Sequence, residues 1–334
     1  MSDPAKRDRF RGALLGLAVG DAIGTAVEFE HPGDFPPVTD MTGGGPFGLP
    51  AGAWTDDTSM ALCLAESLIE RRGFDPVDQL ARYVRWYREG HLSSTGTCFD
   101  IGNATRAALH RFERSGEPFP GSADQNAAGN GPLMKLAPVP LTYCEDLPAA
   151  VSLAGDSART THGAIQAIDA SRYFAALIAA AVNGVGKEEL LRPEPFEPSP
   201  GFWDAAPLHP EVAEVAAGSF LEKDPPEIRG GGYVVHALEA ALWALAKADA
   251  FKDGVLLAVN LGDDADTTGA ICGQLAGALY GVHGIPPEWR QKLVMGERIS
   301  QFADELYELS SQVPAPRLTS AEPDCRRSLR IGNS

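Results

Sequence analysis

Two short runs of carboxylate and hydroxyl side chains could perform chemistry, and they lie near opposite ends of the chain. The first is residues 55–58 (TDDT), and the second is residues 263–268 (DDADTT). Neither run contains Cys or His, and clustered oxygen ligands suit Mg²⁺ or Mn²⁺ better than zinc. A fold that brings the runs together would offer enough carboxylates for two divalent cations. The combination therefore predicts a binuclear site suited to hydrolysis.

Helix capping is the alternative explanation for each run. Both runs open strongly apolar stretches, and Asp and Thr at a helix start accept hydrogen bonds from free backbone N–H groups. For either run alone, capping is the favoured interpretation. One cap needs only one oxygen, however, and crowded carboxylates repel each other unless a cation lies between them. The presence of two such runs favours the metal site.

The composition is that of a globular protein with an acidic surface. The 334 residues are 44% hydrophobic and 22% charged, which is compatible with one large domain. The net charge of −17 argues against non-specific binding to nucleic acid or to an anionic membrane. An anionic small ligand is still compatible, because a bound metal pair would invert the local field.

Cysteine usage and hydropathy indicate a cytoplasmic protein. The five cysteines are odd in number and have no CxxC spacing, which is typical of reduced thiols. The first residues lack the apolar segment of a signal peptide. The best apolar run, 174–182, is too short to span a bilayer, so no membrane association is expected.

Helical patterns dominate the chain, and strand patterns are weak. The proline-dense segment 193–210 is expected to be a surface connection between helices of one core. We therefore expect an all-α fold with a single compact domain over 6–312 and a polar, flexible tail over 313–334. Helices are predicted at 11–29, 57–72, 76–89, 101–114, 145–155, 163–183, 211–221, 233–248 and 288–311, with a further apolar helical stretch after the second acidic run.

Glycines recur at every fourth position near both ends of the chain. Gly12, Gly16, Gly20 and Gly24 share one ridge of the first predicted helix, and 273, 277 and 281 repeat the spacing. Each glycine in a helix is unfavourable by roughly 1 kcal/mol relative to alanine. Such a ridge lets a neighbouring helix approach closely. Both segments are therefore predicted to be tightly packed core helices.

Four further polar segments lie between the acidic runs or beside them. Glu28 ends the glycine-striped helix, and 96–103 (GTCFDIGN) is a glycine-rich turn of the kind that can present N–H groups to phosphate. Residues 130–134 form a turn before an apolar stretch, and 160–162 (TTH) precedes an alanine-rich helix. Each is weak alone, since caps, turns and structural histidines are common.

In combination and order, these segments resemble the ADP-ribosylglycohydrolase family, and within it the bacterial branch typified by the dinitrogenase reductase-activating glycohydrolase. The resemblance spans residues 12 to 281. The matching segments are GALLGLAVGDAIGTAVE (12–28), WTDDTSM (54–60), GTCFDIGNAT (96–105), GNGPLMKLAPVPL (129–141), TTHGAIQAID (160–169), GGYVVHALEAALWAL (231–245) and NLGDDADTTGAICGQLAGALYG (260–281).

The resemblance implies an all-α fold around a binuclear Mg²⁺ or Mn²⁺ centre that cleaves the bond between ADP-ribose and an acceptor. By position it implies the metal ligands Thr55, Asp56, Asp57, Asp264, Asp266 and Thr267. Glu28 and Asp100 match carboxylates implicated in catalysis. The implied substrate-binding residues are Gly102, Asn130, Gly131, His162 and Tyr233. Asp263 is expected to lie behind the ligands or to cap the helix.

The expected activity is hydrolysis of the N-glycosidic bond between ADP-ribose and an arginine side chain of a modified protein, releasing ADP-ribose. Arginine is favoured over other acceptors by analogy with the FDIG segment (99–102). A same-fold hydrolase of serine-linked ADP-ribose, O-acetyl-ADP-ribose or modified nucleic acid remains an alternative, as does a non-catalytic binding relative. A metal-free carboxylate pair, Glu28 with Asp100, is a further alternative that chelator treatment would distinguish. Whether attack is direct or follows ribose ring opening stays open. A monomer is expected, and a nucleic-acid partner is not.

Overall fold

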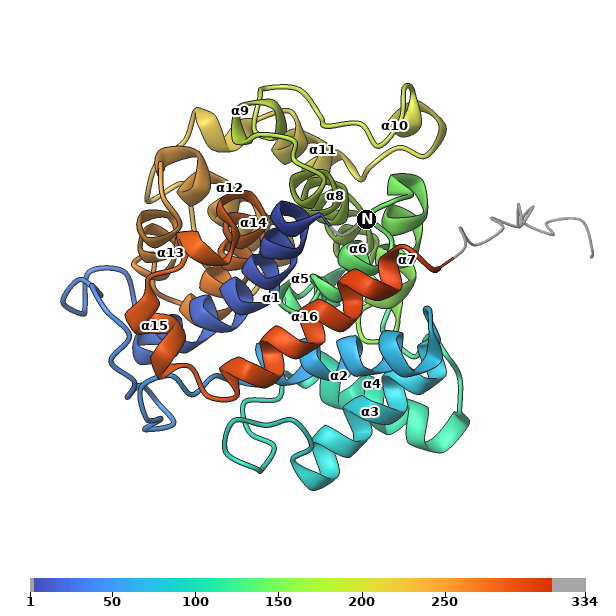
Figure 1. The fold of residues 1–334 in the computed structure, drawn as a ribbon, viewed down its shortest axis with the longest axis horizontal. Coiled ribbons are helices and arrows are strands. Elements are labelled where there is room, and N and C mark those ends of the chain that lie inside the picture. Colours follow the sequence, from blue (N-terminus) through green and yellow to red (C-terminus); the bar gives the residue numbers. More distant parts are fainter. Residues whose placement is uncertain (1–2, 314–334) are drawn as a thin grey trace, which may run out of the picture.

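The computed structural model describes residues 3–313, and in this range the regular structure is helical (Figure 1). β-Pairing among these residues is limited to three isolated bridges, so the predicted all-α fold is confirmed. The α-helices are α1 (Pro4–Gly24), α2 (Asp56–Arg71), α3 (Pro76–Glu89), α4 (Asn103–Ser115), α5 (Gly131–Met134), α6 (Pro138–Thr142), α7 (Leu147–Arg159), α8 (Ile165–Val182), α9 (Lys187–Leu190), α10 (Phe202–Ala205), α11 (Pro210–Ala216), α12 (Val234–Lys247), α13 (Phe251–Val259), α14 (Ala265–Gly284), α15 (Pro287–Lys292) and α16 (Gly296–Ser310). The 3₁₀ turns are η1 (Thr25–Val27), η2 (Gln125–Ala127) and η3 (Ser219–Leu221).

The two glycine-striped helices pack on each other at the centre of the molecule. In Figure 1, α1 (blue) runs alongside α14 (orange), and each glycine ridge faces the backbone of the other helix. A Cβ atom added to Gly16 would lie 2.2 Å from the carbonyl oxygen of Gly273, and one added to Gly20 would lie 2.0 Å from that of Gly269. No side chain larger than hydrogen fits there. The predicted close packing is confirmed, with the two stripes as partners.

This helix pair also brings the ends of the chain together. Gly12 faces Gly277, whereas Gly24 faces Ala265, so α1 and α14 are antiparallel. The carboxyl end of α1, which leads to Glu28, therefore meets the start of α14 and its acidic run. The tight glycine contact fixes this meeting point closely, because neither helix can slide without a backbone clash.

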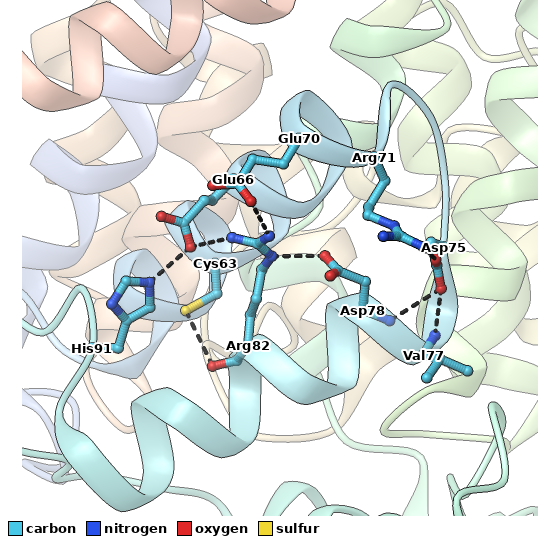
Figure 2. A network of polar contacts seen from close by, with 9 residues as sticks. All are labelled: Cys63, Glu66, Glu70, Arg71, Asp75, Val77, Asp78, Arg82 and His91. Carbon is cyan, nitrogen blue, oxygen red and sulfur yellow. Dashed lines mark hydrogen bonds and ion pairs between the residues drawn. The ribbon is translucent and has the colours of Figure 1, made fainter.

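Helices α2 and α3 are joined by an ion-pair network centred on Arg82 (Figure 2). The Arg82 guanidinium lies 2.7 Å from Asp78, 2.7 Å from Glu70, and in contact with Glu66. His91 lies 2.7 Å from the same Glu66 carboxylate. His91 begins the segment that leads to Asp100, so the network anchors the approach to that residue.

Most predicted helices are present, with shifted ends. The first begins earlier, at Pro4, and gives way to η1 after Gly24. The prediction of one helix over 288–311 is wrong, because Met295 adopts a left-handed conformation (φ 55°) that separates α15 from α16. The predicted helix 211–221 ends early, at Ala216, before Gly218 with φ 97°. Helices α5, α6, α9, α10 and α13 were not predicted. Segment 193–210 is a connection with one short helix, and the predicted tail beyond residue 313 lies outside the described residues.

Two helical segments are long and apolar enough to cross a bilayer, Pro4–Val27 and Ile165–Val182. The apolar run 174–182 is the second half of the longer apolar helix Ile165–Val182. The structure buries 89% of the first apolar window and 83% of the second inside the protein. Packing in the core therefore accounts for their composition.

Candidate active site

A cavity of about 350 Å³ opens where α1, α2 and α14 meet. The acidic side chains come from the end of η1, the first turn of α2, the segment before α4 and the start of α14. The lining residues predicted from the sequence are Glu28, Asp56, Asp100, Gly102, Asn130, Gly131, His162, Asp264, Asp266 and Thr267.

The two acidic runs are in direct contact. The Thr55 hydroxyl donates to Asp266 over 3.1 Å, and the Thr267 hydroxyl donates to Asp57 over 3.2 Å. Thr55 and Asp57 are fully buried behind the cavity lining. The predicted meeting of residues some two hundred positions apart is therefore confirmed.

Helix capping does not explain the runs. Thr55 and Asp264 occupy the cap positions of α2 and α14, yet neither side chain accepts a capping hydrogen bond. Asp3 and Asp75, at the starts of α1 and α3, do accept such bonds from two backbone N–H groups each. The side chains of Thr55 and Asp264 therefore do not serve as helix caps, and capping does not account for them.

Asp21 belongs to this site and was missed in the sequence analysis. It is fully buried in α1 and accepts two hydrogen bonds from Thr55 and two from Thr58, at 2.6 to 3.1 Å. These bonds fix the first turn of α2 against α1. A single carboxylate inside an otherwise apolar, glycine-striped helix was the available signal.

Three carboxylate oxygens show that the site fits a bound cation. Glu28 Oε2, Asp57 Oδ2 and Asp266 Oδ1 are buried and have no hydrogen-bond partner. One carboxylate oxygen from each of Glu28, Asp100 and Asp266 lies within 4.8 Å of the other two. Buried anionic oxygens without donors are strongly unfavourable unless a cation binds them. The all-oxygen donor set suits Mg²⁺ or Mn²⁺.

The protonation behaviour of the acidic group reflects the same crowding. Burial, followed by the negative charges of Asp100, Asp264 and Asp21, raises the pKa of Glu28 to about 9. Burial, followed by Asp21 and Asp264, raises the pKa of Asp100 to about 7. Burial is also the main reason that the pKa of Asp57 lies well above its usual value. Without a cation, burial and the neighbouring negative charges favour the protonated form of these carboxyl groups.

Lys135 is the buried cation behind this group. Its ammonium lies 3.5 Å from the Thr161 hydroxyl, 3.8 Å from Met60 Sδ and 5.4 Å from the centre of the Tyr83 ring. Burial lowers its pKa to about 8, although the charges of Asp56 and Asp57 act in the opposite direction. The lysine thus adds positive charge near the ligands without forming an ion pair with them.

The segment 129–131 packs against His162. A Cβ on Gly131 would lie 2.8 Å from the His162 ring. Burial lowers the pKa of this histidine to about 3, so the ring is neutral. The Asn130 amide donates to Asp264 over 2.7 Å, which makes it a positioning residue for a predicted metal ligand. Its predicted role in substrate binding stays a prediction.

The remaining predicted residues occupy different surroundings. Gly102 lines the cavity at the start of α4. Tyr233 is outside the lining: its backbone pairs with Gly129, and its hydroxyl donates to Glu211. Asp263 does not cap α14. It adopts φ 53°, and its carboxylate lies 3.2 Å from His31.

Comparison with known proteins agrees with this geometry. The family model for ADP-ribosylglycohydrolase matches residues 2–315. The chain is 46% identical to "ADP-ribosylarginine hydrolase Tri1" of Pseudomonas putida (strain GB-1), covering 92% of this chain and 80% of the relative. It is 32% identical to "ADP-ribosyl-[dinitrogen reductase] glycohydrolase" of Rhodospirillum rubrum, covering 88% and 93%.

A solved structure gives the same result. The chain matches an "ADP-ribosylglycohydrolase-related protein complex" with a TM-score of 0.80 and 49% identity, covering 91% of this chain and 99% of that one. The resemblance expected from the sequence is confirmed, and of the relatives named here the arginine hydrolase is more similar than the dinitrogen reductase glycohydrolase. The chain belongs to the ADP-ribosylglycohydrolase family.

Proposed function

We propose that this protein is a metal-dependent hydrolase that removes ADP-ribose from arginine side chains of modified proteins. The observation that carries the proposal is the cavity itself, where two acidic runs meet and leave buried carboxylate oxygens without partners. The acceptor is proposed from the name of the relative with 46% identity over most of this chain.

Two divalent cations, Mg²⁺ or Mn²⁺, would be held by the predicted ligands Thr55, Asp56, Asp57, Asp264, Asp266 and Thr267. The unpartnered oxygen of Glu28 makes this residue a further candidate ligand. When bound, such ions supply Lewis-acid charge and orient hydroxyl groups of the ribose. Asp21 and Asn130 position this set, because they hold Thr55 and Asp264.

Hydrolysis breaks the bond between C1″ of the ribose and the guanidine nitrogen, and it forms a bond from C1″ to the oxygen of water. The proton released by the water ends on the leaving nitrogen, so ADP-ribose and an arginine guanidinium are produced. Glu28 and Asp100 line the cavity, and each can accept and return this proton. The choice between these two carboxylates is left to the mutants described below.

A metal-free mechanism with Glu28 and Asp100 as a carboxylate pair is disfavoured. It would leave the buried oxygens of Asp57 and Asp266 without any partner. A two-carboxylate mechanism would be indifferent to a chelator, whereas the proposed site would not be.

The test is release of free ADP-ribose from an arginine-ADP-ribosylated protein with Mg²⁺, with Mn²⁺ and with EDTA. A serine-linked substrate and the variant Asp264→Ala run beside it. Metal-dependent release from arginine, abolished in the variant, is expected. Release that continues in EDTA would overturn the metal dependence, and release from serine alone would overturn the acceptor. Glu28→Gln and Asp100→Asn, assayed at several pH values, identify the residue that transfers the proton.

The proposal includes the partners and setting expected from the sequence. The substrate is an ADP-ribosylated protein, the product is ADP-ribose, and the enzyme acts as a cytoplasmic monomer. The net charge of −17 favours a basic, arginine-bearing surface over nucleic acid as the partner.

A further inference from the structure

Phe29 is an exposed aromatic residue at the mouth of the acidic cavity. Its exposed fraction is 63%, whereas Glu28 directly before it is buried at 4%; the residues that follow, Glu30 and His31, are exposed. Phe29 lines the cavity together with Asp100 and Ile101. Exposing a large apolar side chain gives up the free energy that its burial would provide. The fold therefore offers no packing reason for a phenylalanine at this position.

The backbone holds Phe29 in an unfavourable conformation. Its φ of 65° lies in the left-handed region, which bulky residues rarely adopt. The Phe29 N–H donates to the Asp263 carbonyl over 2.7 Å, and the Asp263 N–H donates to the Glu30 carbonyl over 2.7 Å. These two bonds tie Phe29 to the residue before the second acidic run. Strain that the surrounding structure maintains in this way is typical of functional sites.

The surroundings of the ring suit a cation. Phe29 is flanked in sequence by Glu28, whose carboxylate faces the cavity, and by the exposed Glu30. Asp100, across the same lining, adds a further carboxyl group. The face of an aromatic ring attracts a guanidinium, which also stacks on it as a planar group. A ring beside carboxylates can thus hold arginine but offers little to a serine hydroxyl.

We propose that the ring of Phe29 stacks on the guanidinium of the ADP-ribosylated arginine and makes arginine the preferred acceptor. This assignment rests on the proposed hydrolase function. It places the ADP-ribose moiety inside the cavity and the acceptor side chain at its mouth. Phe29 is then a specificity residue on the acceptor side, separate from the groups that hold the metals.

Phe47 provides a matched control. It is also exposed, at 37%, but it is absent from the cavity lining and packs edge-on against Phe99, with ring centres 5.2 Å apart. Replacing it removes an exposed aromatic side chain of the same size without touching the proposed acceptor position.

The experiment compares wild type with Phe29→Leu, Phe29→Trp and Phe47→Leu. Steady-state hydrolysis of an arginine-ADP-ribosylated protein gives kcat and KM, and calorimetry gives the affinity for free ADP-ribose, which has no guanidinium. Phe29→Leu should lower kcat/KM about tenfold, mainly through KM, which corresponds to about 1.4 kcal/mol. Its affinity for ADP-ribose and its thermal stability should match wild type. Phe29→Trp should retain activity, and Phe47→Leu should be unchanged.

Two results would overturn the assignment. An unchanged kcat/KM in Phe29→Leu shows that the ring does not contact the acceptor, and an equal loss of ADP-ribose affinity shows that it contacts the ribose instead. Failure of the wild-type enzyme to release ADP-ribose from arginine is a different outcome. That result overturns the proposed function, and with it the proposal that Phe29 stacks on the arginine guanidinium.

Discussion

One helix, α2, contributes to two acidic groups with opposite character. At its start, Asp56 lines the cavity and Asp57 is buried behind the lining, with one carboxylate oxygen that has no partner. About three to four turns later, Glu66 and Glu70 meet the guanidinium of Arg82 (Figure 2). The cavity carboxylates and Glu66 are at least partly buried, whereas Glu70 is exposed. The two groups differ in whether the protein supplies the neutralising cation itself.

The pKa values express this difference. Burial acts to raise the pKa of Glu66, but His91 and Arg82 more than offset it and hold the pKa below its usual value. In the cavity burial is reinforced by like charges, and the pKa of Asp57 rises well above its usual value. Carboxylates that are paired with an arginine of the same protein stabilise the fold. Buried carboxylates without such a partner are suited to binding a cation from solution.

Removing one carboxylate from each group should give the largest contrast. Asp57→Asn should lower release of ADP-ribose by at least about 100-fold, because it removes a metal ligand. The same change should leave the metal-free protein as stable as wild type or more stable, because it relieves repulsion. The matched variant Asp78→Asn should keep activity and lose stability. Hydrolysis assays with Mg²⁺ measure the activity, and unfolding in EDTA measures the stability of the metal-free protein. Equal activity in the two variants would contradict the proposed difference between the cavity carboxylates and the Arg82 group.

The second prediction concerns the positive charge of Arg82 itself. Removing it should lower the stability of the protein. Arg82→Met leaves Glu66 and Asp78 partly buried without their partner, so the free energy of unfolding should fall by about 3 kcal/mol. Urea unfolding monitored by circular dichroism measures this loss. Arg85→Met, at an exposed pair with Glu89, is the control and should change stability little. A similar loss in both variants would show that the network has no special role.

The sequence predicted the chemistry of the site better than its geometry. The oxygen-only runs indicated which residues could be ligands, because donor type can be read directly from composition; their role as ligands stays a prediction. The glycine spacing predicted close packing, but it could not show that the stripe at Gly16 faces the stripe at Gly273, since this pairing is a tertiary contact. Asp21 was missed for the same reason: its partners Thr55 and Thr58 become its neighbours only in the fold.

Local backbone conformation was the second feature that could not be predicted from the sequence. Gly296 follows the break at Met295, but the residue in the left-handed conformation is the methionine itself, which favours no such conformation. Phe29 likewise looked like the last residue of an apolar helix. Tyr233 fell in a matching segment, yet the structure directs its hydroxyl to Glu211, outside the cavity lining. Order along the chain predicts which segments gather, but not which side chains face the cavity.

The two groups should also respond to pH in opposite directions. Because the folded-state pKa values of Glu28 and Asp100 are raised, to about 9 and about 7, the folded metal-free protein binds protons more tightly than the unfolded chain. The stability that Glu28 and Asp100 contribute is fully present below their unfolded-state pKa values of 4.5 and 3.8. It is lost as the pH rises through their folded-state pKa values of about 9 and about 7. Glu66 and Asp78 have lowered pKa values, so their contribution is present above pH 4.5 and 3.8 and is lost in acid.

Thermal unfolding from about pH 3 to pH 9 tests this opposition, because the contribution of Glu66 and Asp78 is lost only below pH 4.5 and 3.8. In EDTA, stability should fall with rising pH at up to about 2.7 kcal/mol per unit between pH 5 and 7, the slope for the two protons of Glu28 and Asp100. Between pH 7 and 9 the slope should be up to about 1.4 kcal/mol per unit, because only the proton of Glu28 remains. Saturating Mg²⁺ should remove the fall, because the cation replaces the protons. A slope that is the same with and without Mg²⁺ would show that the metal does not bind these carboxylates.

The smallest expected effect concerns Lys135, which is the one feature of the cavity group that resembles the Arg82 group. Its ammonium is buried near Asp56 and Asp57 but contacts Thr161 and Met60 instead of a carboxylate. Lys135→Met removes a positive charge that competes with the metal, so Mg²⁺ affinity should rise about fivefold, or ~1 kcal/mol. Calorimetric titration of Mg²⁺ measures the change, with Thr161→Val as the uncharged control. A lower affinity in Lys135→Met would mean that the lysine holds the ligands in place, as Arg82 does in its own group, and the contrast between the two groups would then be one of degree.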